Sequence, residues 1–205
     1  KSLGIMGETG SGKSSIINLM ERFFDVSEGT VKIDGYDVRD LSLNQVRSSM
    51  TTVMQDVFLF SDTVKENISM GERETMEIEE VTQAARLAQA HDFIVEMENE
   101  YSTVIGERGV GMSGGQKQRI SIARTFAKPA PILVMDDSTS ALDMETESEI
   151  QKALKEVSGK TKVIIAHRIS AVRHADEILI LEAGKIAERG THEELIAQKG
   201  LYYET

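Results

Sequence analysis

Residues Gly7–Ser14 read GETGSGKS, and an apolar run, SLGIM (2–6), stands directly before them. The following segment, SSIINLMERFF (14–24), has the apolar spacing of an amphipathic helix. The stretch fits the phosphate-binding pattern G-x-x-x-x-G-K-[ST], whose glycines let backbone N–H groups turn toward phosphate oxygens. Lys13 would reach the β- and γ-phosphates, and Ser14 would hold magnesium. The alternative is a glycine-rich turn with a solvated lysine, and the flanking strand and helix disfavour it.

Apolar strands and helical patterns alternate along the rest of the chain. A strand that leaves through a turn is predicted at TVKIDG (30–35). Further strands are predicted at MTTVMQ (50–55), ILVMDD (132–137) and KVIIAH (162–167), and a hairpin at EILILEAGKIAERG (177–190). Between them, residues 72–98 carry the helical spacing of Ile78, Val81, Ala85 and Ala88, and another helix follows Ser113. This alternation predicts α/β architecture with a largely parallel sheet and an inserted helical lobe.

The composition limits the possible partners. A length of 205 residues allows one domain with a single core. The net charge of -11 would repel a phosphate backbone, so we expect no nucleic-acid partner. The absence of cysteine excludes a disulfide framework, and no apolar run approaches the ~20 residues of a membrane-spanning helix. The sequence begins at Lys1, with one strand before the glycine-rich loop, so we expect a fragment whose membrane attachment would come from elsewhere.

The stretch ILVMDDSTSALD (132–143) places two acidic residues after an apolar run. Asp136 could hold the same magnesium ion as Ser14, and Asp137 could orient a water molecule. By itself, an apolar run that ends in aspartate usually marks a buried strand entering a turn. The phosphate-binding loop in the same chain favours the magnesium interpretation.

A second glycine-rich helix start lies at MSGGQKQRISIAR (112–124). Ser113 is a suitable helix N-cap, two glycines follow it, and Ile120, Ala123 and Ala127 form an apolar stripe. Physical reasoning leaves two interpretations evenly matched: a capped amphipathic helix, or a second anion-binding helix start that serves a nucleotide held by another chain.

Taken in order, these motifs resemble the nucleotide-binding domain of ABC transporters over essentially all 205 residues. The resemblance implies a P-loop NTPase (RecA-like) core at 1–55 and 117–205, a helical subdomain at 56–116, and a partial antiparallel β region truncated at the N-terminus. It implies ATP and Mg²⁺ as cofactors, catalytic roles for Asp137, His167 and Gln55, and magnesium ligands Ser14, Gln55 and Asp136. The implied nucleotide-binding residues are Gly7, Glu8, Thr9, Gly10, Ser11, Gly12, Lys13, Ser14 and Ser15, with a signature of Ser113, Gly114, Gly115 and Gln116 and a D-loop at Ser140–Asp143. Without the resemblance, Gln55 would be read as a surface glutamine and His167 as a core histidine.

Two further stretches, QDVFLFSDTVKENI (55–68) and STVIGERGVGMSGGQ (102–116), resemble exporter-type domains. The resemblance implies an ATP-driven translocase on the cytoplasmic side of a cell membrane. Its partners would be a transmembrane domain and a second nucleotide-binding domain that packs head to tail. The chain would contact the membrane only through the transmembrane domain.

Three positions depart from the family pattern. Met112 replaces the usual leucine, a swap of similar volume that should cost little. The adenine-stacking aromatic is not found in this sequence. Asp137 stands where hydrolysing members carry glutamate, as in the slow subunit of heterodimeric multidrug exporters, so we expect slow hydrolysis at this chain's own site. The alternatives are a homodimeric exporter that tolerates aspartate and a soluble ABC-class ATPase that acts as a switch.

Overall fold

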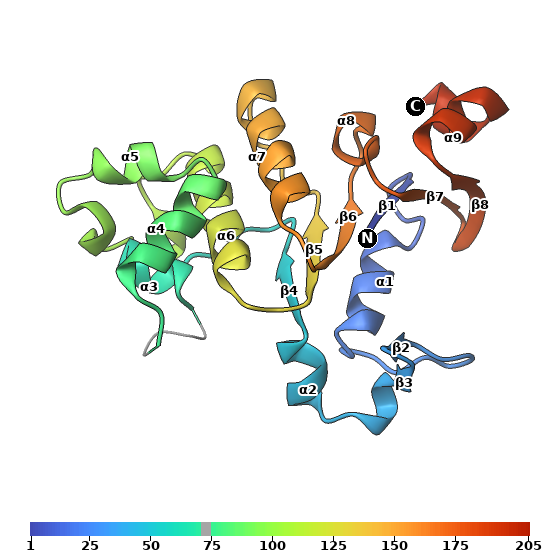
Figure 1. The fold of residues 1–205 in the computed structure, drawn as a ribbon, viewed down its shortest axis with the longest axis horizontal. Coiled ribbons are helices and arrows are strands. Elements are labelled where there is room, and N and C mark those ends of the chain that lie inside the picture. The colour runs from blue at the N-terminus through green and yellow to red at the C-terminus, as the bar shows by residue number, and fades with distance from the viewer. Residues whose placement is uncertain (71–74) are drawn as a thin grey trace. The chain divides into compact units, whose positions relative to one another are not determined.

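The computed structural model describes residues 1–70 and 75–205. The described residues pack into two compact units (Figure 1). The sheet unit comprises Lys1–Thr52, Ala130–Asp137 and Lys160–Thr205. The helical unit comprises Val53–Pro129 and Ser138–Gly159. The bounds of these packing units differ from the subdomain bounds predicted from the sequence, 1–55, 56–116 and 117–205. The predicted subdomains stay a prediction.

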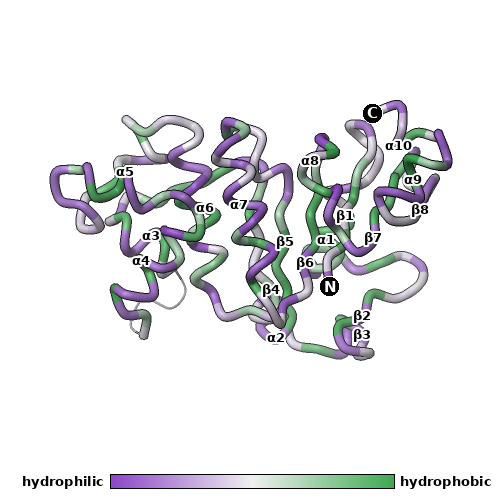
Figure 2. Tube along the Cα trace, turned by 45° about the horizontal axis from the view of Figure 1, so that its top comes forward, coloured by the Kyte–Doolittle hydropathy of each residue, from purple (hydrophilic) through white to green (hydrophobic). Residues whose placement is uncertain are grey.

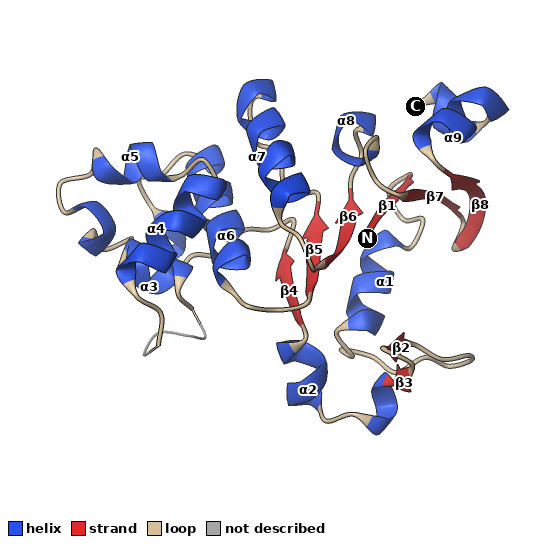
Figure 3. Ribbon diagram, viewed as in Figure 1, coloured by secondary structure: helices blue, strands red, loops and turns tan. Residues whose placement is uncertain are grey.

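Six strands form the main sheet within the described residues, in the order β4-β5-β6-β1-β7-β8 (Figure 3). Their bounds are β1 Ser2–Gly7, β4 Met50–Val53, β5 Ile132–Asp136, β6 Thr161–Ile165, β7 Glu177–Glu182 and β8 Lys185–Gly190. The pairs β5–β6, β6–β1 and β1–β7 are parallel, and β7–β8 is the predicted antiparallel hairpin. The largely parallel α/β sheet predicted from the sequence is therefore confirmed.

The strand register brings three sequence motifs to one edge of the sheet. Ile165 of β6 pairs with Ile5 of β1 on one side and with Asp136 of β5 on the other. Because these strands are parallel, their carboxyl ends lie at the same edge, and Gly7, Asp136 and His167 follow there.

Adjacent residues of each central strand face opposite sides of the sheet and enter different cores, as the two-residue period of a strand requires. Ile5, Ile165 and Leu181 pack with Ile17 of α1 (Lys13–Met20) in one cluster. Their chain neighbours pack in a second cluster, whose residues are Met6, Ile164, Ala166, Ala171, Val172, Ile178, Ile180, Leu195 and Tyr202. Hydrophobic residues accordingly follow the central strands in Figure 2.

The remaining helices of the sheet unit are short. They are α2 Leu43–Ser48, α8 Ile169–Val172, α9 His192–Gln198 and α10 Leu201–Glu204, with a 3-10 turn, η1, at Val38–Asp40. The predicted strand at 30–35 forms only in part, because β2 (Lys32–Ile33) turns back into β3 (Tyr36–Asp37). Asp34 and Gly35 both have positive φ, 49° and 85°, as a tight hairpin turn between twisted strands requires.

The helical unit contains α3 Val64–Ile68, α4 Ile78–Leu87, α5 His91–Val95, α6 Gly114–Ala127 and α7 Met144–Glu156, with 3-10 turns η2 Glu100–Ser102 and η3 Glu107–Gly109. The helix predicted after Ser113 is confirmed as α6. The helical pattern predicted over 72–98 forms two helices, α4 and α5, because Gln89, with φ 56°, interrupts the helical backbone between them. The first part of that prediction, up to residue 74, lies outside the described residues.

In the part of the chain that the structure describes, no helix combines the length and the hydrophobicity that crossing a membrane requires.

Candidate nucleotide-binding site

The loop between β1 and α1 depends on glycine at its first position. Gly7 has φ 148°, and a Cβ there would lie 2.3 Å from the carbonyl oxygen of Leu181 and 2.7 Å from Ser11 Oγ. Gly10 and Gly12 also have positive φ, 84° and 106°. Larger residues would strain all three positions, so the spacing of the motif is a requirement of the backbone.

Lys13 lies largely buried beneath this loop. Its Nζ donates hydrogen bonds to the carbonyl oxygens of Gly7, at 2.7 Å, and Glu8, at 2.9 Å. Burial lowers the pKa of the Lys13 ammonium, and the negative charges of Asp136 and Asp137 act in the opposite direction. Because these contacts hold the ammonium group against the loop, it can interact with an anion placed there without first being ordered.

The N-terminus of α1 has donors suited to an anion. Gly12 is its N-cap and, among the described residues, no side chain caps it. The first N–H groups of a helix have no intrahelical acceptor, and they carry the positive end of the helix dipole. Ser11 Oγ is buried and has no hydrogen-bond partner within the described chain. A bound phosphate would supply the missing acceptors, so the residues present fit a nucleotide.

Asp136 and Asp137 stand at the carboxyl end of β5. Burial raises the pKa of Asp136, the charge of Asp137 adds to the increase, and Lys13 and His167 oppose it. These four side chains therefore share one electrostatic environment within the sheet unit. Asp137 has φ 43°, and its N–H donates to the carbonyl oxygen of Ile165 at 2.9 Å. Aspartate tolerates this left-handed conformation better than most residues do.

His167 follows β6 and is exposed. The preceding Ala166 donates its N–H to the carbonyl oxygen of Ile5 at 3.2 Å, which fixes the chain where it leaves the sheet. The alternative of a core histidine was therefore wrong. His167 lines a cavity of about 660 Å³ together with Gly7–Ser11, Met6, Ile180–Ala183, Leu201, Glu204 and Thr205.

Of the predicted site residues, Thr9, Gly10, Ser14 and Ser15 are exposed on the loop and the first turn of α1. The sheet unit thus brings together Gly7–Ser15, Asp136, Asp137 and His167, whose individual roles remain predictions. Gln55 and the segment from Ser113 to Gln116 belong to the helical unit. Gln55 is exposed there.

The N-terminus of α6 is closed by its own side chains. Ser113 Oγ accepts a hydrogen bond from the Gln116 N–H at 3.2 Å, and Gln116 Oε1 accepts one from the Ser113 N–H at 2.9 Å. This is a capping box. The structure therefore bears out the capped amphipathic helix, and a role in anion binding stays a prediction.

Sequence reasoning missed Gln118, which lies on α6 and is 2% exposed. Its Oε1 accepts a hydrogen bond from the N–H of Ala141, in the predicted D-loop, at 3.0 Å. Gly115 approaches the same segment, because a Cβ at that position would lie 3.3 Å from the Ala141 carbonyl oxygen. No local pattern marks Gln118, since its partner is 23 residues away.

Residues 1–70 and 75–205 contain no group of three or more histidine, aspartate or glutamate side chains arranged to hold a metal ion. The predicted magnesium set contains one carboxylate, Asp136. Magnesium usually takes one or two carboxylates together with phosphate oxygens and water, so this set fits magnesium only in the presence of a nucleotide.

The first strand of this largely parallel sheet leads through a glycine-rich loop into a helix that begins with a buried lysine, and β5 ends in an acidic residue at the same edge of the sheet. This arrangement defines a P-loop nucleotide-binding domain. A family model described as ABC transporter matches residues 1–140. The chain belongs to the ABC transporter family, and it is an ABC-type ATPase that binds ATP.

Relatives in this family include two Staphylococcus aureus proteins, from strains NCTC 8325 and COL, both named as multidrug export ATP-binding/permease proteins. Each is 51% identical over 203 residues, which cover 98% of this chain and 35% of the relative. A solved structure of a bacterial Atm1-family ABC exporter with ATP bound is 43% identical, with a TM-score of 0.94, and covers 98% of this chain and 35% of the other. This chain therefore spans about a third of the length of the relatives that it matches.

Proposed function

We propose that this chain is the ATP-binding and ATP-hydrolysing domain of an ABC exporter, and that its own site hydrolyses ATP slowly. The named relatives combine an ATP-binding part with a permease, and the chain matches about a third of their length. The remainder of such a protein would supply the transmembrane domain, which holds this domain at the cytoplasmic side of the cell membrane. The transported substrate would be recognised by that remainder.

In this proposal, the loop from Gly7 to Ser15 binds the ATP phosphates. Lys13 contributes its positive charge, and Ser11 donates from its unpartnered hydroxyl group. Ser14, Gln55 and Asp136 would hold Mg²⁺, which neutralises phosphate charge when bound. Asp137 orients the attacking water and accepts its proton at a carboxylate oxygen, while His167 stands at the end of the neighbouring strand.

The proposal of slow hydrolysis rests on the aspartate at position 137, where hydrolysing members of the family carry glutamate. Aspartate and glutamate have similar reference pKa values, about 3.9 and 4.3, so basicity hardly distinguishes them. Aspartate is shorter by one C–C bond, about 1.5 Å, and a misplacement of ~1 Å can cost on the order of 100-fold in rate. That loss corresponds to about 2.7 kcal/mol of activation free energy.

The slow site leads us to propose a heterodimer. Two such domains would pack head to tail, so that each ATP lies between the Walker motifs of one chain and the signature of the other. The segment from Ser113 to Gln116 keeps the usual S-G-G-Q sequence, whereas residue 137 departs from the pattern. This chain would then contribute its altered acid to one site and its intact signature to the other. The partner would carry glutamate after its Walker B aspartate.

Purification of the intact transporter and identification of its chains tests the heterodimer. The expected result is two different subunits with unequal ATP sites, and a homodimer with two equally active sites would contradict it. The variant Ser113→Arg should remove most of the ATPase activity of the heterodimer, since it introduces a bulky cation into the partner's site. ATP binding to this chain's own loop should be unchanged.

A further inference from the structure

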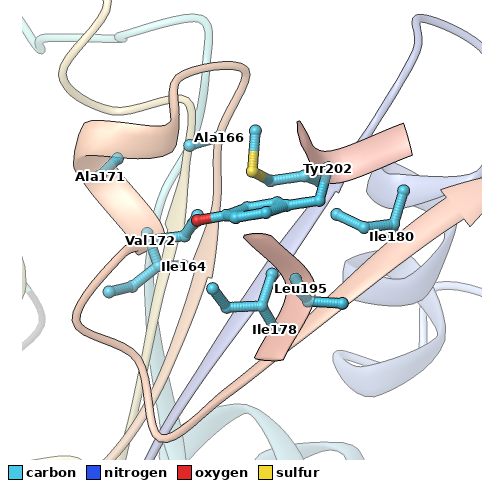
Figure 4. Packing of buried hydrophobic residues seen from close by; sticks show 9 residues of the cluster. Ile164, Ala166, Ala171, Val172, Ile178, Ile180, Leu195 and Tyr202 are labelled. Carbon is cyan, nitrogen blue, oxygen red and sulfur yellow. The ribbon is translucent and has the colours of Figure 1, made fainter. Parts of the chain in front are cut away.

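The last helix of the chain, α10, docks on the sheet unit through Tyr202. This side chain is 0% exposed and belongs to the cluster that contains Met6 and Ala166. Figure 4 shows its ring among the side chains of Ala166, Val172 and Leu195. A fully buried tyrosine in a close-packed cluster cannot shift without moving its neighbours.

Two polar contacts hold α10 in this position. The Tyr202 hydroxyl and His192 Nδ1, on α9, form a hydrogen bond of 2.7 Å. The Glu188 carboxylate of β8 accepts hydrogen bonds from the N–H groups of Leu201, at 2.5 Å, and Tyr202, at 3.1 Å. Gly200 makes this approach possible, because a Cβ at that position would lie 1.9 Å from Glu188 Oε1. The contacts fix both the main chain and the side chain of residue 202.

The neighbours of Tyr202 in its cluster lead directly into the nucleotide site. Met6 immediately precedes Gly7 of the phosphate-binding loop, and Ala166 immediately precedes His167. Residues of α10 also line the same cavity as the loop and His167. The position of α10 is therefore linked, through one hydrophobic cluster, to the two strand ends that carry site residues.

We infer that Tyr202, held by His192 and Glu188, is a positioning residue for the nucleotide site. Its ring keeps Met6 and Ala166 in place, and through them the loop at Gly7 and the exposed His167. A displacement of ~1 Å at such a site can change rates on the order of 100-fold, so a packing residue behind it affects function as well as stability. The inference rests on the proposed function of the loop as the ATP site.

The chain offers a matched control in the helical unit. Tyr101 is also buried, and its hydroxyl bonds to His91 Nδ1 at 2.9 Å, with the same separation of ten residues between the partners. We would compare Tyr202→Phe and Tyr202→Leu with Tyr101→Phe and Tyr101→Leu in the intact protein. The measurements are the ATP dissociation constant, kcat and KM, at a temperature at which thermal melting shows every variant folded.

Tyr202→Leu should raise the ATP dissociation constant about tenfold, since it disturbs the cluster that contains Met6 and Ala166, the residues next to the loop and His167. Tyr202→Phe retains the ring and should restore most of the affinity, leaving a change of about twofold. The Tyr101 variants should lose similar thermal stability with unchanged ATP affinity. Equal ATP affinities across the Tyr202 and Tyr101 series would overturn the inference.

Two additional variants keep the result interpretable. If Tyr202→Leu does not fold, Tyr202→Phe and His192→Ala carry the test, because each removes the 2.7 Å contact that holds the ring in position. Each should raise the ATP dissociation constant about twofold, and unchanged affinity in both would overturn the inference. Lys13→Ala reports on the ATP site itself. If Lys13→Ala binds ATP as the wild type does, the proposed function fails. If it loses binding while the Tyr202 variants do not, only the positioning role fails.

Discussion

The N-termini of α1 and α6 both follow glycine-rich segments, yet their backbone donors are in opposite states. At α1, the N-cap is Gly12 with φ 106°, and among the described residues no side chain caps the helix. At α6, Ser113 and Gln116 bond to each other's backbone N–H groups in a capping box. The N-terminus of α1 thus keeps backbone N–H donors for an external anion. At α6, side chains of the helix itself supply acceptors for some of these donors.

The comparison shows that glycine serves different purposes in the two regions. Gly7 is needed because the backbone adopts positive φ and passes close to the Leu181 carbonyl. Gly115, in contrast, lies inside a helix and lets the segment at Ala141 approach the helix surface. A phosphate can therefore bind at α1 without rearrangement of a cap. At α6, any anion would meet a helix that is already capped.

The largest expected difference between the regions is in stability. Gly7→Ala combines backbone strain with a clash against a main-chain oxygen, and should lower the free energy of unfolding by about 4 kcal/mol. Gly115→Ala should change it by less than about 1 kcal/mol, because better helix propensity offsets a tight contact with Ala141. Chemical denaturation of both variants measures the difference. Equal losses would mean that the two glycines serve the same purpose.

The next largest effect is on ATP affinity. Lys13→Ala should weaken ATP binding on the order of 100-fold, because it removes charge-assisted hydrogen bonds worth about 1.5–3 kcal/mol. Gln116→Ala, at α6, should leave ATP binding to this chain's own loop unchanged. Titration with ATP and magnesium compares the two, with Lys13→Met as a control that retains the apolar part of the side chain. A similar loss in Gln116→Ala would remove the distinction between the two helix starts.

The smallest effect concerns the cap itself. Ser113→Ala should lower the free energy of unfolding by about 1 kcal/mol, the usual value for loss of an N-cap side chain. Thr191→Ala provides the control, since Thr191 forms the same capping box with Glu194 at α9. The two variants should show similar shifts in thermal denaturation. A stabilised Ser113→Ala variant would indicate that the α6 terminus is strained instead of capped.

Much of the sheet could be predicted from the sequence because its signals are local. The apolar runs at β1, β5 and β6 and the hairpin at β7–β8 are continuous stretches with strand character, and parallel strands buried on both faces read in this way. The loop at Gly7–Ser14 could also be predicted. Each of its glycines has a positive φ, and the spacing of glycines in the motif reflects this backbone conformation. The turn predicted at the end of TVKIDG is confirmed, because the D-G pair at Asp34–Gly35 forms the hairpin between β2 and β3.

The missed features depend on contacts between distant residues. Gln118 bonds to Ala141 across 23 positions, and Tyr202 shares a hydrophobic cluster with Met6 at the other end of the sequence. Asp137 has a left-handed backbone and donates its N–H to the carbonyl oxygen of Ile165. No residue near Asp137 in the sequence predicts this conformation. The break between α4 and α5 at Gln89 could not be predicted because glutamine is an ordinary helix former, and only the local hydrogen bonds show where the chain turns.

The claim that Asp137 limits hydrolysis at this chain's own ATP site is tested most directly by Asp137→Glu. Single-turnover hydrolysis would be measured at this site in the intact protein, with hydrolysis at the partner site silenced and Asp137→Asn as the inactive control. The account predicts that Asp137→Glu hydrolyses ATP on the order of 100-fold faster than the wild type, because the longer side chain restores the reach of the carboxylate. A rate equal to or below that of the wild type, with ATP binding intact, would contradict it.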